Sequence, residues 1–117
     1  MEQLNRVELR GMVGSIRKTT VQERAMAQMS IATNYAYKDA DGCVVIETTW
    51  HNVRLWEGKN IAKEDIDSLE KGDKVCVLGR IRNQRYVGED GIDRYSCEII
   101  ASALSKLDNS EALSLEN

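Results

Sequence analysis

The sequence predicts an all-β protein with five strands and one helix between the third and the fourth strand. Five segments alternate apolar with polar residues or are rich in Val, Ile, Thr and aromatic residues, as strands are. One segment alone has the apolar spacing of a helix. The chain has no proline, and the Asp-Gly pairs at 41–42 and 90–91 are typical of hairpin turns.

The strand candidates cover most of the chain. In the first, Val7, Leu9 and Val13 alternate with Glu8 and Arg10, which gives the strand one apolar face. The other four candidates are the segments 25–37, 43–56, 75–86 and 92–104. Each Asp-Gly pair lies between two of these segments, so we expect two hairpins.

The segment between the third and fourth candidates has a helical period. Three apolar residues recur there at i, i+4 and i+7 among acidic neighbours: Ala62, Ile66 and Leu69. We expect a helix near 59–71, with Asn60 as its N-cap, Gly72 just past its end, and a solvated acidic face. Five strands with one helix in this position is the order of a five-stranded OB-fold barrel.

Length and composition indicate a single domain. A chain of 117 residues buries one core and leaves little room for a second. We expect the barrel domain at 1–104 and a short polar tail at 105–117. No apolar run approaches the roughly 18 residues that span a bilayer, and the first residues lack a signal-peptide pattern. The expected location is therefore the cytoplasm, without membrane contact.

The sequence offers little for catalysis or metal binding. Cys43, Cys76 and Cys97 are far apart and form no Cys-x-x-Cys pair, and His51 is the only histidine. Nucleophile and phosphate-loop motifs are absent. We expect reduced thiols, no catalytic residue, no metal and no cofactor. The alternatives are a redox or metal role for the cysteines and catalytic acids on the helix.

Charge is distributed unevenly along the chain. The net charge of −3 by itself argues mildly against a nucleic-acid partner. However, segment 57–73 holds six acids and three lysines, whereas 80–86 holds three arginines and no acid. Segment 1–37 has five basic and three acidic residues. The acidic surplus therefore lies on the helical segment and the basic surplus lies elsewhere.

Side-chain alternation divides the third strand into two faces. Val53 and Leu55 are expected in the core. The opposite face carries Trp50 and Trp56 with Arg54 between them. Two tryptophans on the polar face of one strand are hard to bury, because each indole N–H needs a partner. The alternative is that a tryptophan covers the end of the barrel or a subunit interface.

The fourth strand repeats this arrangement. One parity contains cations and an aromatic ring: Arg80, Arg82, Gln84 and Tyr86. An edge strand protected by charge is the alternative. Tyr35 and Tyr37 extend the aromatic set at the end of the second strand. Because they share the parity of Met29 and Ile31, one of them is expected in the core unless a bulge intervenes.

Interleaved aromatic rings and arginines are typical of proteins that bind single strands without reading their sequence. Every base offers a ring face for stacking, and cations follow the phosphates. Duplex DNA hides these ring faces. The residues themselves therefore predict binding of single-stranded DNA without a reaction.

Several motifs occur in order along the chain. The most recognisable is Glu47-Thr48-Thr49-Trp50-His51-Asn52-Val53, and shorter ones lie at 5–7, 30–34, 71–75, 79–82, 90–91 and 94–95. Together they resemble the bacterial single-stranded DNA-binding protein family over residues 4–104. The loops after Gly14 and Trp56 differ in length from the family pattern.

The resemblance implies an OB-fold that assembles as a homotetramer, or as a dimer, and binds single-stranded DNA at the nucleoid in replication, recombination and repair. The base-stacking positions of the family correspond to Tyr37, Trp50, Trp56 and Tyr86. Its basic positions correspond to Arg6, Arg82 and Arg85 and, more loosely because of the longer loop, to Lys59. Strand alternation adds Arg54 to this DNA-binding set. His51 matches a subunit-interface position, and Asn52 stands where a basic residue is frequent.

The C-terminus departs from the family pattern. The family normally carries a long linker and an acidic tip that recruits repair proteins, whereas this chain has no proline or phenylalanine and ends at Leu115-Glu116-Asn117. We expect a short form, either truncated or from a plasmid or mobile element, in which recruitment through such a tip is absent. A replication-restart or scaffold protein that acts mainly through protein contacts is the alternative function.

Overall fold

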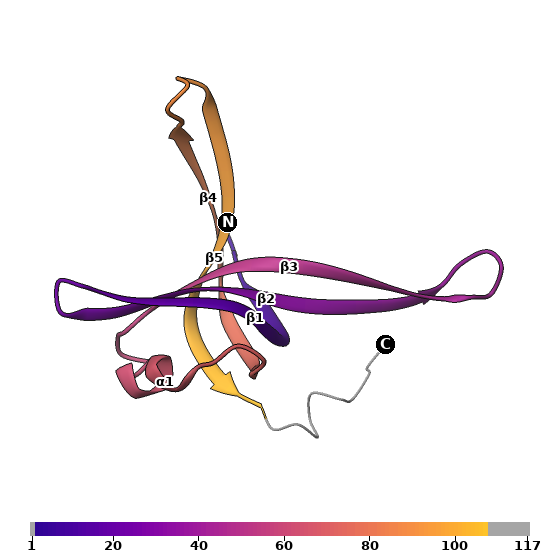
Figure 1. Cartoon of the computed structure of the whole chain (residues 1–117), viewed down its shortest axis with the longest axis horizontal. Coiled ribbons are helices and arrows are strands. Elements are labelled where there is room, and N and C mark those ends of the chain that lie inside the picture. Colours follow the sequence, from indigo (N-terminus) through magenta and orange to yellow (C-terminus); the bar gives the residue numbers. More distant parts are fainter. Residues whose placement is uncertain (1, 108–117) are drawn as a thin grey trace.

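The computed structural model describes residues 2–107 and confirms the predicted fold class. In chain order the elements are β1 (Val7–Val21), β2 (Arg24–Lys38), β3 (Val44–Trp56), α1 (Lys63–Ser68), β4 (Lys74–Val87) and β5 (Asp93–Lys106) (Figure 1). The first strand is longer than expected, because β1 continues to Val21. β5 includes the first two residues of the expected tail, and the tail from residue 108 lies outside the described residues.

The five strands close into a barrel in the order β1-β2-β3-β5-β4. The pairs are antiparallel except that β3 runs parallel to β5, where Val53 pairs with Ile99. The register of β4 against β5 shifts between Leu78 and Gly79. A side chain at Gly79 would overlap the carbonyl group of Ile100. Glycine therefore allows the two strands to approach closely where the barrel bends.

The core lies inside the barrel and extends onto the segment around α1. Strand alternation brings Val13, Ile31, Leu55, Val75 and Val77 inward, and all five are buried. The connection from β3 to β4 adds three more buried side chains: Ile61, Ile66 and Leu69. Burying an aliphatic side chain contributes about 1.5–3 kcal/mol, so this connection stabilises the barrel that it covers.

The helix is shorter than the sequence predicts. α1 begins after Ala62, which is exposed, and the predicted N-cap Asn60 lies outside it. It ends at Ser68, and the following residue, Leu69, has an extended backbone. Gly72 has a positive φ of 94°, but it lies in the turn into β4, where its N–H donates to the carbonyl of Val13. Ile61 and Leu69 are buried on either side of the helix but have non-helical backbone. The apolar spacing in the sequence therefore predicted a helix that is too long.

The β2–β3 and β4–β5 hairpins extend well beyond the barrel (Figure 1). Their outer ends have no core to cover them. Tyr35 and Tyr37 are both exposed although they share the parity of Met29 and Ile31, so the expectation that one of them lies in the core is wrong. Ile81 is likewise 44% exposed. Side chains still alternate between the two faces of each hairpin arm. However, the face that continues from the inner face of the barrel has no core to pack against.

Candidate nucleic-acid interface

The outer face of β3 carries the tryptophans, as alternation predicts. Trp50 is 60% exposed and Trp56 is half-buried, whereas Val53 and Leu55 on the inner face are buried. Pairing across the three strands places the outward residues in rows. Asn52 lies opposite Ser30, which pairs with Ser15, and Arg54 lies opposite Gln28, which pairs with Arg17. Two polar rows therefore separate the row of Trp50 from the row of Trp56.

The indole of Trp50 lies over β1. A side chain at Gly14 would overlap the Trp50 ring, and the same position is within reach of the Ser30 hydroxyl. Gly14 stands at a register shift between Val13 and Ser15. The absence of a side chain allows the ring to rest on the sheet and leaves much of its surface exposed. Sequence reasoning did not identify this role, because Gly14 and Trp50 are paired only through an intervening strand.

Trp56 is covered on one ring face by an arginine. The guanidinium carbon of Arg24 lies 5.1 Å from the ring centroid of Trp56. Arg24 Nε donates to the carbonyl of Glu57 at 2.6 Å, and the N–H of Ala25 donates to a Glu57 carboxylate oxygen at 3.0 Å. These contacts fix the start of β2 against the end of β3. Sequence reasoning did not identify Arg24, since it precedes the predicted strand segment 25–37, whereas in the structure it is the first residue of β2.

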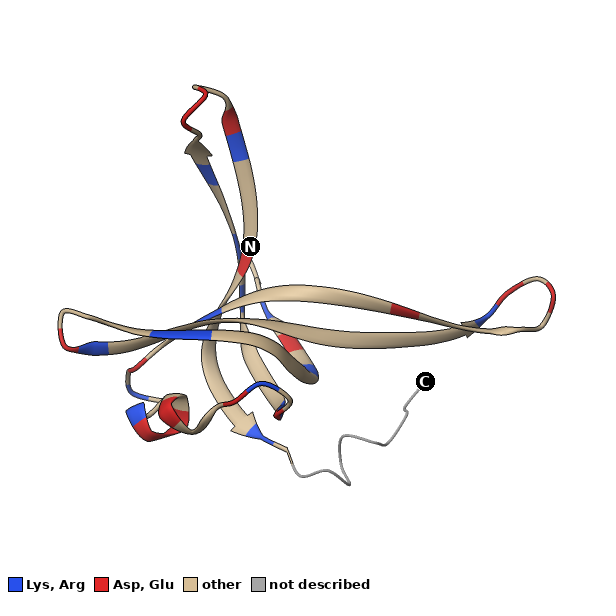
Figure 2. Ribbon diagram, in the orientation of Figure 1, with Lys and Arg blue, Asp and Glu red and all other residues tan. Residues whose placement is uncertain are grey.

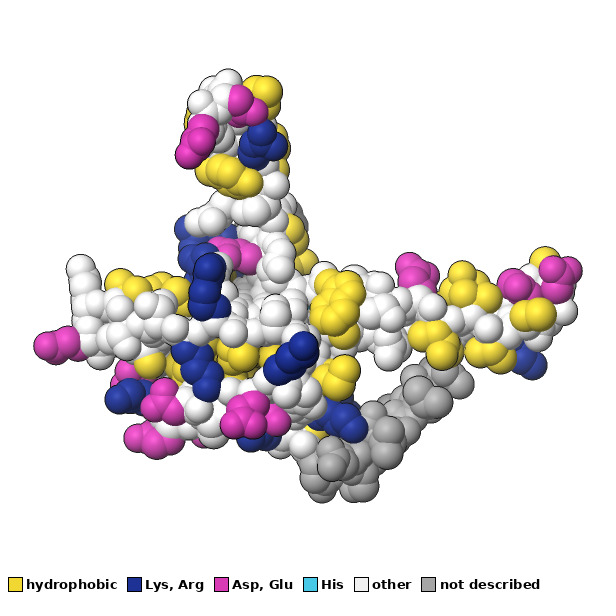
Figure 3. All heavy atoms as spheres, viewed as in Figure 1, with side chains coloured by type: hydrophobic (Ala, Val, Ile, Leu, Met, Phe, Trp, Pro, Cys, Tyr) yellow, Lys and Arg dark blue, Asp and Glu magenta, His cyan; other side chains and the backbone are white. Residues whose placement is uncertain are grey.

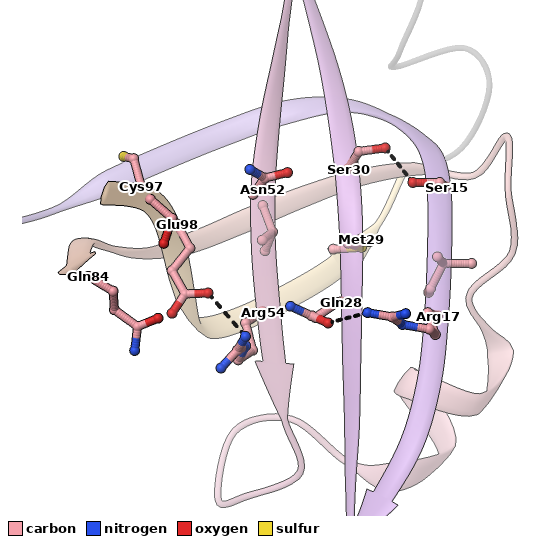
Figure 4. Close-up of a pocket in the computed structure, with 13 residues that line it drawn as sticks. Ser15, Arg17, Gln28, Met29, Ser30, Asn52, Arg54, Gln84, Cys97 and Glu98 are labelled. Atoms are coloured by element: carbon pink, nitrogen blue, oxygen red, sulfur yellow. Dashed lines mark hydrogen bonds and ion pairs between the residues drawn. The ribbon is translucent and has the colours of Figure 1, made fainter. Parts of the chain in front are cut away.

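A groove of about 500 Å³ lies over the two polar rows. Its floor comes from β1, β2 and β3, and one wall comes from the β4–β5 ribbon (Figure 4). Hydrogen bonds order the floor, with Ser15 and Ser30 hydroxyls 2.8 Å apart and Arg17 donating to Gln28 at 3.0 Å. The lining offers many donors and acceptors: Arg17, Gln28, Asn52, Arg54, Gln84 and Glu98.

Arg54 meets an acid at the edge of this groove. Its Nη2 lies 3.4 Å from Oε2 of Glu98, and the two side chains are 26% and 10% exposed (Figure 4). Arg54 Nε and Glu98 Oε1 are buried without a hydrogen-bond partner. The predicted DNA-contacting arginine on β3 is therefore engaged in an ion pair within the chain.

Charge separates on the molecule as it does in the sequence. Acidic residues gather on α1 and near the hairpin ends, with a few on the strands, and most basic residues lie along the strands (Figure 2). The face drawn in Figure 3 carries several Lys and Arg side chains around exposed hydrophobic ones. Within residues 2–107, no three His, Cys, Asp or Glu side chains are placed to hold a metal ion. No helix of that part of the chain is long and apolar enough to cross a membrane.

Comparison with known proteins matches residues 4–107 to the model of the "Single-strand binding protein family". The chain belongs to this family. It is 37% identical over 108 residues to the single-stranded DNA-binding protein of Xanthomonas axonopodis pv. citri (strain 306), covering 89% of this chain and 58% of that protein. The corresponding protein of Neisseria meningitidis serogroup A is 32% identical over 106 residues, with 89% and 60% covered. The chain thus spans about three fifths of these curated relatives.

Solved structures of the family share the fold. The Plasmodium falciparum SSB in complex with ssDNA has a TM-score of 0.76 and 25% identity, covering 92% of this chain and 98% of that one. The small single-stranded DNA-binding protein of Streptomyces coelicolor has a TM-score of 0.69 and 23% identity, covering 95% and 99%. Membership of a family of binding proteins also agrees with the prediction that the chain is not an enzyme.

The residues implied by the family resemblance do not all lie together. Arg82 and Tyr86 share the ribbon face of Gln84 and Glu98, beside the groove. Arg85 belongs to the other parity of that ribbon and pairs with Asp93 at 3.3 Å.

Three further implied positions lie away from the groove rows. Tyr37 stacks with Tyr35, their centroids 5.9 Å apart, on the parity opposite to Trp50. Arg6 precedes β1, Lys59 lies between β3 and α1, and both are exposed.

His51 lies on the inner parity of β3, where the barrel gives way to the hairpin arm. It is half-buried, and its Nε2 is 2.8 Å from the hydroxyl of Thr33. Its place at a subunit interface stays a prediction.

Proposed function

We propose that this chain binds single-stranded DNA with little regard to sequence and without catalysing a reaction. One observation carries the proposal. Trp50 and Trp56 lie on one outward strand face, on either side of a polar groove that contains arginines. Such a face offers stacking surfaces for bases and cations for phosphates. The Plasmodium falciparum relative was solved as a complex with ssDNA, which supports the same partner here.

In this proposal the aromatic residues act as stacking platforms. Bases stack on the exposed surface of Trp50, on Trp56, on Tyr86 and on Tyr37, each contact contributing about 1–3 kcal/mol. Phosphates are neutralised by exposed cations: Arg6, Lys59, Arg82 and Arg85. Arg54, which is paired with Glu98, contacts DNA from within the groove. Arg24 joins this set, because its guanidinium already lies against Trp56.

The proposed biological setting follows the family. We infer that the protein acts in the cytoplasm at the nucleoid, in replication, recombination and repair. We also infer self-assembly into a homotetramer, or a dimer, with His51 near a subunit contact. Exposed apolar residues on both hairpin arms, among them Tyr35, Ile46, Val87 and Tyr95, support assembly because they lack cover within one chain. Sedimentation at micromolar concentration is expected to give a multiple of 13.2 kDa, and a mass of one chain would contradict assembly.

A fluorescence titration tests DNA binding directly. Oligothymidine is added to the full chain at two salt concentrations, and the emission of its two tryptophans is followed. Quenching with saturation is expected for the single strand, and a duplex of equal length is expected to bind more weakly because its bases are already stacked. Absence of binding at both salt concentrations would favour the alternative of a scaffold that works through protein contacts.

A further inference from the structure

Glu98 is an unexpected residue for a groove that takes DNA. It is 8% exposed and is the only buried polar or charged residue within residues 2–107. It forms part of the groove wall on β5. A carboxylate in this position repels phosphates and costs free energy to bury, so a purely electrostatic groove gains nothing from it.

The ion pair between Arg54 and Glu98 leaves each side chain with a buried atom that has no hydrogen-bond partner. Arg54 Nη2 contacts Glu98 Oε2 at 3.4 Å, which is a long ion pair. Arg54 Nε and Glu98 Oε1 remain buried without a partner. A buried donor or acceptor without a hydrogen bond destabilises the protein. A ligand that supplies one acceptor and one donor to this pair would remove that penalty.

We propose that Arg54 and Glu98 read the edge of a base held between Trp50 and Trp56, and that they favour cytosine and adenine over thymine. This inference rests on the proposed binding of single-stranded DNA in the groove. It adds a modest base preference to stacking that is otherwise tolerant of sequence.

The position of the pair supports this assignment. Arg54 lies between the tryptophans on the same outward face of β3, and Trp56 follows Trp50 by six positions. At about 3.3 Å per residue, the two indoles are attached roughly 20 Å apart, which leaves room for bases between them. The Arg54 side chain is 26% exposed. Its flexible stem allows the guanidinium to turn and admit a base edge to the carboxylate.

The chemistry of the bases explains the preference. Cytosine and adenine each present an amino group next to an unprotonated ring nitrogen, so the amino group donates to Glu98 while the ring nitrogen accepts from Arg54. The only donor of thymine is a ring N–H between two carbonyl oxygens. When that N–H donates to Glu98, one neighbouring oxygen accepts from Arg54, but the other lies against the carboxylate, and like partial charges repel. Thymine therefore gains less from the pair.

The test compares oligocytidine with oligothymidine of equal length. Dissociation constants are measured by tryptophan quenching for the full chain, for the Arg54→Leu/Glu98→Leu double variant and for Glu98→Gln. Replacing a buried ion pair by apolar residues of similar volume is often tolerated, so the double variant is expected to fold. Glu98→Gln keeps the shape of the side chain and removes its charge. Glu89→Gln, at the exposed end of the ribbon, is the matched control for loss of one acid.

The readout is the ratio of affinity for oligocytidine to affinity for oligothymidine. We expect this ratio to be at least about fivefold higher in the unmodified chain and in Glu89→Gln than in the double variant. Glu98→Gln is expected to lower the ratio as the double variant does. An equal ratio in all folded variants would overturn base reading, and a lowered melting temperature with that equal ratio would identify the pair as structural. If the unmodified chain binds neither oligonucleotide, the proposed function itself fails and the inference fails with it.

Discussion

The surroundings of the two tryptophans differ, although both side chains project from the same face of β3. Trp50 rests on the sheet at Gly14 and is 60% exposed, whereas Trp56 is half-buried beneath Arg24. A rigid, exposed ring loses little conformational freedom when a base stacks on it. A ring already in contact with a guanidinium offers one free face. The two side chains therefore contribute to binding in different ways.

Replacement of Trp50 by alanine is expected to weaken binding of oligothymidine by about 1–3 kcal/mol, because one stacking surface is lost. The melting temperature is expected to change little, since the ring is largely exposed. Ile92→Ala is a suitable control, because Ile92 is an exposed apolar side chain in the turn between β4 and β5. Fluorescence of Trp56 and thermal melting measure the two effects, and unchanged affinity in folded Trp50→Ala would refute stacking at this ring.

Arg24 is expected to act through Trp56 as well as through its own charge. Arg24→Ala removes the cation from the indole and the hydrogen bond to the Glu57 carbonyl. An exposed cation–π contact contributes about 0.5–1 kcal/mol, so a loss of this size in DNA affinity is expected. Arg24→Lys retains the charge but not the planar group, and it is expected to recover only part of the loss. Equal affinity of all three proteins would leave Arg24 with a purely structural role.

At the scale of the elements, the sequence predicted most of the fold because strand period and turn chemistry are local signals. Five alternating segments and two Asp-Gly pairs were enough for five strands, and the parity of Val53 and Leu55 correctly assigned the outward face of β3. Local patterns contain no information about where the core ends. For this reason Tyr35 and Tyr37 were expected partly inside, although they lie on a hairpin arm beyond the barrel.

The parts of the site that sequence reasoning missed depend on contacts between distant strands. Gly14 supports Trp50 across β2, and Arg24, at the start of β2, contacts Trp56 at the end of β3. The Arg54–Glu98 pair joins residues on β3 and β5 that lie 44 positions apart in the sequence. No spacing rule connects such residues, because the closure of the barrel brings them together.

The two faces of the β4–β5 ribbon lead to a separate prediction. Arg82 is exposed on the face beside the groove, whereas Arg85 pairs with Asp93 on the other parity. Arg82→Ala is therefore expected to weaken single-strand binding more than Arg85→Ala does. Of these two arginines, Arg82 is the one that lies beside the groove and has no ion pair among the described residues. Titrations of both variants at one salt concentration measure the difference. A larger loss for Arg85→Ala would indicate that DNA follows the opposite face.

At the scale of the whole molecule, the segregation of charge reconciles an acidic protein with an anionic partner. The net charge is −3, yet the acids gather on α1 and near the hairpin tips, and among the described residues Glu98 is the one acid that lines the groove with Arg17 and Arg54. Interactions between charges more than about 8–10 Å apart are largely screened at physiological ionic strength. The local cations therefore determine how phosphates bind, and the acidic helix has little effect on them.

This separation predicts how affinity depends on salt. The logarithm of the binding constant is expected to fall linearly with the logarithm of salt concentration, with a slope of about −0.7 for each phosphate neutralised on a single strand. Arg82→Ala is expected to reduce the magnitude of that slope by about 0.7, because one phosphate contact is lost. Glu64→Gln, on the exposed face of α1, is the control and is expected to leave the slope unchanged. A slope that responds to Glu64 as strongly as to Arg82 would mean that DNA also passes over α1, and the acidic helix would then have to be included in the binding path.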